Sequence, residues 1–277
     1  MWTDADRKEY APTRVRYESD LTDEEWEIIS VLFEDYCTLT VDLREMVNAC
    51  FYIQRTGCQW RYLPKEFGSW QTVRWWHDRF KKDGIWEQIS ALLHSQVRKQ
   101  SGKNPQPSTT LLDSQSVPSG PQAGERGYDG HKKIKGIKRH ALVCTFGFIL
   151  AVIVTPANVH DTKAVPVLLE RANESENATV KNVLVDGIYK GPIVDEAAKD
   201  HGVDVQIASK NKDAEKKGFI PQPIRWRIEA TFGIMTNYYR RLTRNWEQSP
   251  EDHENICWAF NARRLLYNFF RNKNDVT

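Results

Sequence analysis

The spacing of apolar residues changes at one polar segment, RKQSGKNPQPS (98–108), and this change constrains the fold more than any other feature of the chain. Before the segment, apolar residues recur at helical spacing, and after it short apolar runs are typical of strands. The segment has two prolines among polar residues, as a linker does. We therefore predict a polar arm over 1–18, a helical domain over 19–97, a linker over 98–108 and an α/β domain over 109–272.

Four helices are predicted in the first domain. Asp20 or Thr22 can cap the first of them, and the TDEE run suits its positively polarised start. The second spans 41–55, the third runs from Ser69 to Gly84, and the fourth spans about 86–97. A dense aromatic group is expected to fill the core of this small domain: Trp60, Trp70, Trp75, Trp76, Phe80 and Trp86. In a helix-turn-helix-like domain the third helix, with Arg74 and Arg79, would face the DNA groove.

The second domain has the predicted order β-β-β-α-β-α-β-α. The strands are expected at 109–117, 140–147, 148–157, 180–187 and 203–209. The helices are expected at 162–172 and 191–200, and the final helical part of the order comprises two segments, 226–244 and 251–271. Strands that first form a meander and then alternate with helices favour a mixed sheet flanked by helices.

Three acidic residues stand at informative places in this order. Asp113 lies within the strand pattern TLLDSQSV, Asp186 ends VKNVLVDG, and Glu229 opens the amphipathic segment RWRIEATFG. Taken singly, each has an ordinary explanation: a solvated strand edge, a turn, or a surface ion pair. Taken together, they could converge as oxygen ligands for two Mg²⁺ ions, with Mn²⁺ as a substitute, in an enzyme that cuts phosphodiesters.

Two basic clusters could bind DNA phosphates. The segment HKKIKGIKRH contributes Lys132, Lys133, Lys135, Lys138 and Arg139, and the alternative is a charged hairpin edge that prevents aggregation. The second cluster surrounds Glu229 and contains Arg225, Arg240 and Arg241, with ion pairing to Glu247 as the alternative for the last two.

Composition excludes several classes of protein. The five cysteines are scattered without a CxxC pair, which argues against a structural zinc site. No apolar run approaches the roughly 20 residues that span a bilayer, and the N-terminus is not a secretory signal. We expect a cytoplasmic protein with reduced cysteines. For the pair His160-Asp161, helix capping by Asp161 is favoured over catalysis.

Several longer segments resemble a known family: TGCQWRYLPKEFGSWQTV, LLDSQSV, GYDGHKKIKGIKRHALVCTFGFILAVIVTPANVHD and VLVDGIY, together with the region 221–247. They are similar to those of DDE transposases of insertion sequences, in the family numbered five and its branch with a helical N-terminal domain. The resemblance covers roughly residues 18–270.

The resemblance implies a ribonuclease-H-like catalytic domain in which Asp113, Asp186 and Glu229 bind the catalytic metals. It also implies an N-terminal domain that binds DNA ends, cleavage at terminal inverted repeats, and attack of the freed 3′-hydroxyl on target DNA. A homodimer or higher oligomer on double-stranded DNA, associated with the nucleoid, is expected on the same ground.

Two other functions are compatible with the same residues. A metal-dependent nuclease of this fold would cut DNA without joining it. An inactive or domesticated DNA-binding remnant is suggested by Gln222, Ala230 and Thr236, which replace the tyrosine and two basic residues expected around Glu229.

Overall fold

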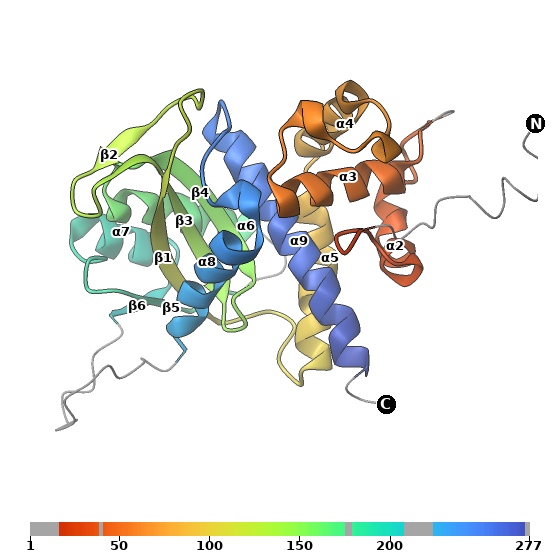
Figure 1. Cartoon of the computed structure of the whole chain (residues 1–277). Helices are drawn as coiled ribbons and strands as arrows, with labels where there is room; N and C mark the ends of the chain where they lie inside the picture. Colours follow the sequence, from red (N-terminus) through yellow and green to blue (C-terminus); the bar gives the residue numbers. More distant parts are fainter. Residues whose placement is uncertain (1–16, 39–40, 175–178, 208–223, 275–277) are drawn as a thin grey trace, which may run out of the picture.

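The computed structural model describes residues 17–38, 41–174, 179–207 and 224–274. Most of the predicted polar arm and Gln222 lie outside these residues. In Figure 1 a curled sheet with its helices lies at one side of the molecule and a group of shorter helices at the other, with the long helix α9 (Pro250–Asn274) between them.

The four helices predicted before the linker are present. They are α2 (Asp23–Ile29), α3 (Leu43–Thr56), α4 (Trp70–Lys82) and α5 (Ile85–Gln100). Thr22, rather than Asp20, caps α2 and forms a reciprocal capping box with Glu25. Gly57 ends α3 with a φ of 67°, a left-handed conformation that glycine adopts without strain.

The sheet is mixed, as predicted. Its strands are β1 (Thr109–Pro118), β2 (Gly127–Asp129), β3 (Ile134–Cys144), β4 (Ile149–Pro156), β5 (Asn182–Val185) and β6 (Asp204–Ile207). The order is β2-β3-β1-β5-β6, with β4 also paired to β3. The pairs of β1 with β3 and of β3 with β4 are antiparallel, whereas β5 pairs in parallel with β1 and with β6. The short β2 was not predicted, because three residues carry no periodicity.

Alternation along β1 assigns its side chains to the two faces of the sheet. Leu112 packs in a core cluster with α6 (Val165–Glu174) and α7 (Pro192–Asp200). Leu111 faces the other way and packs with α8 (Trp226–Tyr238) and α9. Helices therefore cover both faces, and the face that carries Leu111 is the one against which α8 lies.

The N-terminal helices share their core with the second half of the chain. Phe51, Phe80 and Trp86 belong to one buried cluster that also includes Phe148 from the β3–β4 turn and Leu266 from α9. The ion pairs Lys81–Asp252 (2.5 Å) and Arg263–Glu25 (2.6 Å) cross the same seam. The two regions therefore pack against each other through a shared core. The domain boundaries remain predictions.

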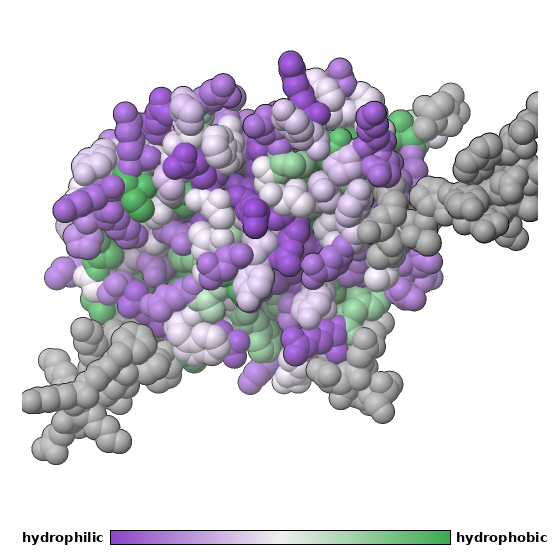
Figure 2. All heavy atoms as spheres, in the orientation of Figure 1, coloured by the Kyte–Doolittle hydropathy of each residue, from purple (hydrophilic) through white to green (hydrophobic). Residues whose placement is uncertain are grey.

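The predicted aromatic core is largely present. Phe80 and Trp86 are fully buried and Trp76 is nearly so, but Trp75 points outward with 59% of its surface exposed. Hydrophilic side chains cover most of the face shown in Figure 2. Among the helices that the structure describes, none is long and apolar enough to cross a membrane.

Candidate catalytic site

Asp113 and Asp186 lie on neighbouring parallel strands at matching positions. Leu111 of β1 is paired with Leu184 of β5, and each aspartate follows its leucine by two residues. Because side chains alternate along a strand, Asp113 lies on the same face of the sheet as Leu111. Asp186 comes directly after the last residue of β5, where the strand leaves the sheet. The pairing of β1 with β5 therefore brings together two acids that are distant in sequence.

Glu229 completes the group from the first turn of α8, which packs on this face. One nitrogen of Arg225, Nη2, marks the point of convergence. It lies 3.4 Å from Asp113 Oδ2, 3.0 Å from Asp186 Oδ2 and 3.8 Å from Glu229 Oε1. The structure thus brings the three predicted acids around a single guanidinium group. Arg225 was predicted as a DNA contact, and its bridging of the acids was not anticipated.

The three carboxylates fit a divalent metal site by their chemistry, since Mg²⁺ and Mn²⁺ take carboxylate oxygens as ligands. No group of three or more His, Cys, Asp or Glu side chains within the described ranges already has metal-binding geometry. The acids face Arg225 instead. Burial raises the pKa of Asp113, although the Ser114 amide and Arg225 oppose that effect. Its side chain is 20% exposed, against 52% for Asp186 and 54% for Glu229.

The segment HKKIKGIKRH divides into an exposed part and a buried part. Lys132 and Lys133, in the turn before β3, and Lys135, near its start, are exposed. Lys132 lies near enough to Asp113 to favour the ionised form of that aspartate. Lys138 and Arg139, in contrast, are 6% and 0% exposed. The prediction that these last two grip phosphate is wrong, because from Ile137 onward β3 is a central strand between β1 and β4.

Three of the four other predicted arginines already have partners. Arg74 and Arg79 each pair with an acid four residues later, Asp78 within α4 and Asp83 at its C-terminal cap, at 3.0 and 2.6 Å. Arg241 is buried and pairs with buried Glu247 at 2.6 Å. Its position agrees with the alternative of an ion pair and not with a DNA contact at the surface. The fourth arginine, Arg240, is exposed.

A buried polar network, which was not predicted from the sequence, lies on the opposite face of β1. Lys138 Nζ pairs with Asp161 Oδ1 at 2.9 Å and lies 3.9 Å from Asp129. Ser114 donates to Asp161, and Ser116 donates to Asp129. The run DSQS could have indicated this network, because it places polar residues on both faces of one strand. The network fixes β1 directly behind Asp113. The prediction that Asp161 caps a helix is wrong: the capping residue is His160, and Asp161 binds Lys138 and Ser114 in this network.

His140 should make the fold sensitive to acid. It is fully buried, its Nε2 lies 2.9 Å from the Thr155 hydroxyl, and burial lowers its pKa to about 4, with Asp161 opposing and Lys138 and Lys132 adding to that effect. Its contribution to stability is complete above the unfolded pKa of about 6.5 and is lost as the pH falls to about 4.

The unfolding free energy should fall less in the variant His140→Gln than in the parent between pH 6.5 and pH 4, by up to about 3 kcal/mol. Urea unfolding at several pH values measures this slope. Equal slopes for the variant and the parent would show that His140 is not a source of the acid sensitivity.

The fold is that of a ribonuclease-H-like domain, and three acids converge on one face of its sheet. Two family models match the chain: "Transposase DDE domain" over residues 104–263, and "Putative transposase of IS4/5 family" over residues 21–90. A search of curated proteins found no match to the chain. The first model covers more than half of the chain, which therefore belongs to the DDE-domain transposases, and specifically to the IS4/5 type. Such enzymes carry out DNA transposition and generally use divalent metal ions.

Proposed function

We propose that this transposase cleaves DNA at the ends of its insertion sequence and joins the freed ends to target DNA, using Asp113, Asp186 and Glu229 as ligands for two divalent cations. The observation that carries the proposal is the convergence of the three acids within 4 Å of one nitrogen of Arg225. Bound cations would supply a lowered pKa for the attacking water and stabilisation of the leaving oxygen.

The residues of the chain have distinct parts in this proposal. Asp113, the least exposed of the three, anchors the site on the rigid sheet, while Asp186 and Glu229 approach from the strand end and the helix. Lys132, Lys133 and Lys135 would hold DNA phosphates next to the acids. In cleavage, the oxygen of water bonds to phosphorus as the bond to the 3′-oxygen breaks, which leaves a 3′-hydroxyl. In joining, that 3′-oxygen attacks a target phosphodiester and displaces its 3′-oxygen.

A strand-transfer assay tests this function and separates it from its alternatives. Labelled DNA carrying the terminal repeats that flank the gene is incubated with the protein, Mg²⁺ or Mn²⁺, and plasmid target. We expect nicks at the repeat ends and joined products from donors with a 3′-hydroxyl. Cleavage without joining would indicate a nuclease. Binding without cleavage would indicate the inactive remnant that Ala230 and Thr236 suggest.

The exposed lysines should provide salt-dependent affinity for DNA. The triple variant Lys132→Gln, Lys133→Gln and Lys135→Gln should bind end DNA more weakly and lower the slope of log affinity against log salt by about 2–3. Fluorescence anisotropy at several salt concentrations measures both quantities. The double variant Lys163→Gln and Lys199→Gln, which changes exposed lysines on the α6–α7 side, is the control. An unchanged slope in the triple variant would remove these lysines from the interface.

Arg225 should compete with metal before DNA binds. Its guanidinium lies where cations would have to approach the acids, and two positive charges a few ångströms apart repel. The variant Arg225→Ala should therefore bind Mn²⁺ about tenfold more tightly in the absence of DNA, as measured by electron paramagnetic resonance. Arg227→Ala, which removes an arginine stacked on Trp226 instead, is the control. Weaker Mn²⁺ binding by Arg225→Ala would mean that Arg225 organises the acids for metal rather than excluding it.

The partners and location follow from this function. Double-stranded DNA, both as terminal repeats and as target, is the proposed substrate, with two or more copies of the chain acting on paired ends. A protein with this substrate would reside in the cytoplasm on the nucleoid.

A further inference from the structure

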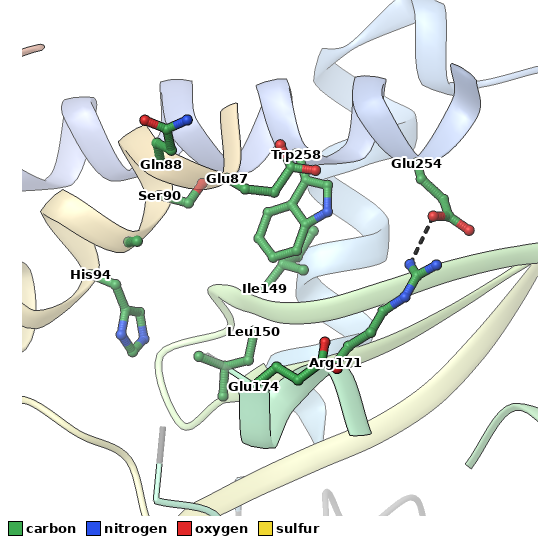
Figure 3. Close-up of a pocket in the computed structure, with 11 residues that line it drawn as sticks. Glu87, Gln88, Ser90, His94, Ile149, Leu150, Arg171, Glu174, Glu254 and Trp258 are labelled. Atoms are coloured by element: carbon green, nitrogen blue, oxygen red, sulfur yellow. Dashed lines mark hydrogen bonds and ion pairs between the residues drawn. The ribbon is translucent and has the colours of Figure 1, made fainter. Parts of the chain in front are cut away.

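A cavity of about 640 Å³ lies away from the three acids, at the seam between α5 and the sheet domain. Figure 3 shows its walls: Glu87, Ser90 and His94 come from α5, Arg171 from α6, and Trp258 from α9. The size is in the range of pockets that hold small molecules. Nothing in the proposed transposition chemistry uses these residues.

The wall formed by α5 carries buried polar atoms that lack partners. Ser90 and His94 are only 3% and 2% exposed. Among the described residues, the Ser90 hydroxyl, both ring nitrogens of His94 and Oε2 of Glu87 find no hydrogen-bond partner. The spacing 87, 90 and 94 places all three on one face of the helix. Leaving a buried polar group unsatisfied is unfavourable, so four such atoms from three side chains on one cavity wall point to a ligand that completes them.

The charge of the cavity is negative. Of the described residues that line it, Glu87, Glu174 and Glu254 are acidic and one, Arg171, is a cation, which is already paired with Glu254 at 2.8 Å. Burial, with Glu254 nearby, raises the pKa of Glu87 to about 7. Phosphates and other anions would be repelled here. Apolar surface is provided by Ile149 and Leu150 of β4 and by the ring of Trp258.

We propose that this cavity binds a small organic cation, an ammonium or guanidinium group carried on a short apolar body. The cationic head donates hydrogen bonds to Glu87 Oε2, the Ser90 hydroxyl and the acceptor nitrogen of His94. The body packs against Leu150 and Trp258, whose ring also attracts cations. The ligand would bridge α5 and α9, the two helices that join the halves of the molecule. The same chemistry is offered by a free amine or guanidine and by an arginine or lysine side chain of a second copy of this chain.

Isothermal titration calorimetry of the full chain with butylguanidinium, and with its uncharged analogue butylurea, tests the proposal. Butylguanidinium is expected to bind and butylurea to bind at least tenfold more weakly. Glu87→Gln should weaken binding of the cation by at least tenfold, and Ser90→Ala by a smaller factor. Glu170→Gln, which removes an exposed acid on α6 outside the cavity, should leave it unchanged. Because the cation favours ionised Glu87, binding at pH 7 should release a proton, seen as a heat that depends on the buffer.

Sedimentation of the parent and of Glu87→Gln distinguishes the two sources. A lower association state in the variant assigns the cation to a second copy, and an unchanged state assigns it to a free ligand. The proposal is overturned if butylguanidinium gives no heat with the parent, if butylurea binds as well, or if folded Glu87→Gln and Ser90→Ala both bind the cation with the parent's affinity.

Discussion

Asp113→Asn is expected to reduce DNA strand cleavage by at least about a thousandfold, equivalent to about 4 kcal/mol of activation free energy. Asparagine keeps the shape of the side chain but removes the charge that a divalent cation needs from its ligand. Of the three acids, Asp113 is the least exposed and is fixed by the strand, so water or a neighbouring acid cannot easily replace it. Cleavage of end DNA, quantified on sequencing gels, measures the effect.

The fold should tolerate this substitution. Because burial raises the pKa of Asp113, its ionised form destabilises the fold near pH 7, and the thermal unfolding midpoint of Asp113→Asn should not fall below that of the parent. Asp195→Asn, at an exposed position on α7, is the matched control and should cleave normally. Cleavage by folded Asp113→Asn within tenfold of the parent would show that the acid does not hold catalytic metal.

Arg139→Ala should destabilise the protein by about 3–5 kcal/mol, because it empties a fully buried site and leaves the oxygens of Gln115 and Leu242 without their donor. Arg139 is fully buried and donates from Nη2 to Gln115 on β1 and from Nη1 to the Leu242 carbonyl at 3.1 Å. It therefore ties β3 to β1 and to the segment that follows α8. Urea unfolding at pH 7 measures the loss of stability.

The same variant tests whether Arg139 contacts DNA. If Arg139 is structural, the folded fraction of Arg139→Ala binds DNA with the parent's affinity, whereas Lys135→Ala, at an exposed position four residues earlier, weakens DNA binding without affecting stability. A stable Arg139→Ala protein that binds DNA poorly would show that Arg139 does contact DNA phosphates, as the sequence predicted.

Local patterns in the sequence were sufficient to predict the elements that carry the acids. The runs around Asp113 and Asp186 have the alternation and length of strands, and the helical spacing near Glu229 places that residue in the first turn of α8. The strand neighbours could not be predicted in this way. Periodicity does not say that β5 pairs with β1, and this pairing is what sets the two aspartates side by side.

The errors arose where tertiary contacts override composition. A run with five basic residues suggests a charged surface, but β3 begins at Ile134 and passes between β1 and β4, so Lys138 and Arg139 become buried. In the same way, the polar segment 98–108 correctly marks where strands begin. It could not reveal that α9 returns to pack along α5 and gives both regions a common core.

In the proposed function, Asp113, Asp186 and Glu229 form one site for divalent cations at the position that Arg225 occupies in the structure. Anomalous diffraction from crystals of the protein bound to end DNA and Mn²⁺ tests it most directly. We expect manganese peaks within about 2.3 Å of carboxylate oxygens from all three acids, with Arg225 moved away from them. A complex that contains DNA but shows no manganese at these acids, with Arg225 still bridging them, would contradict it.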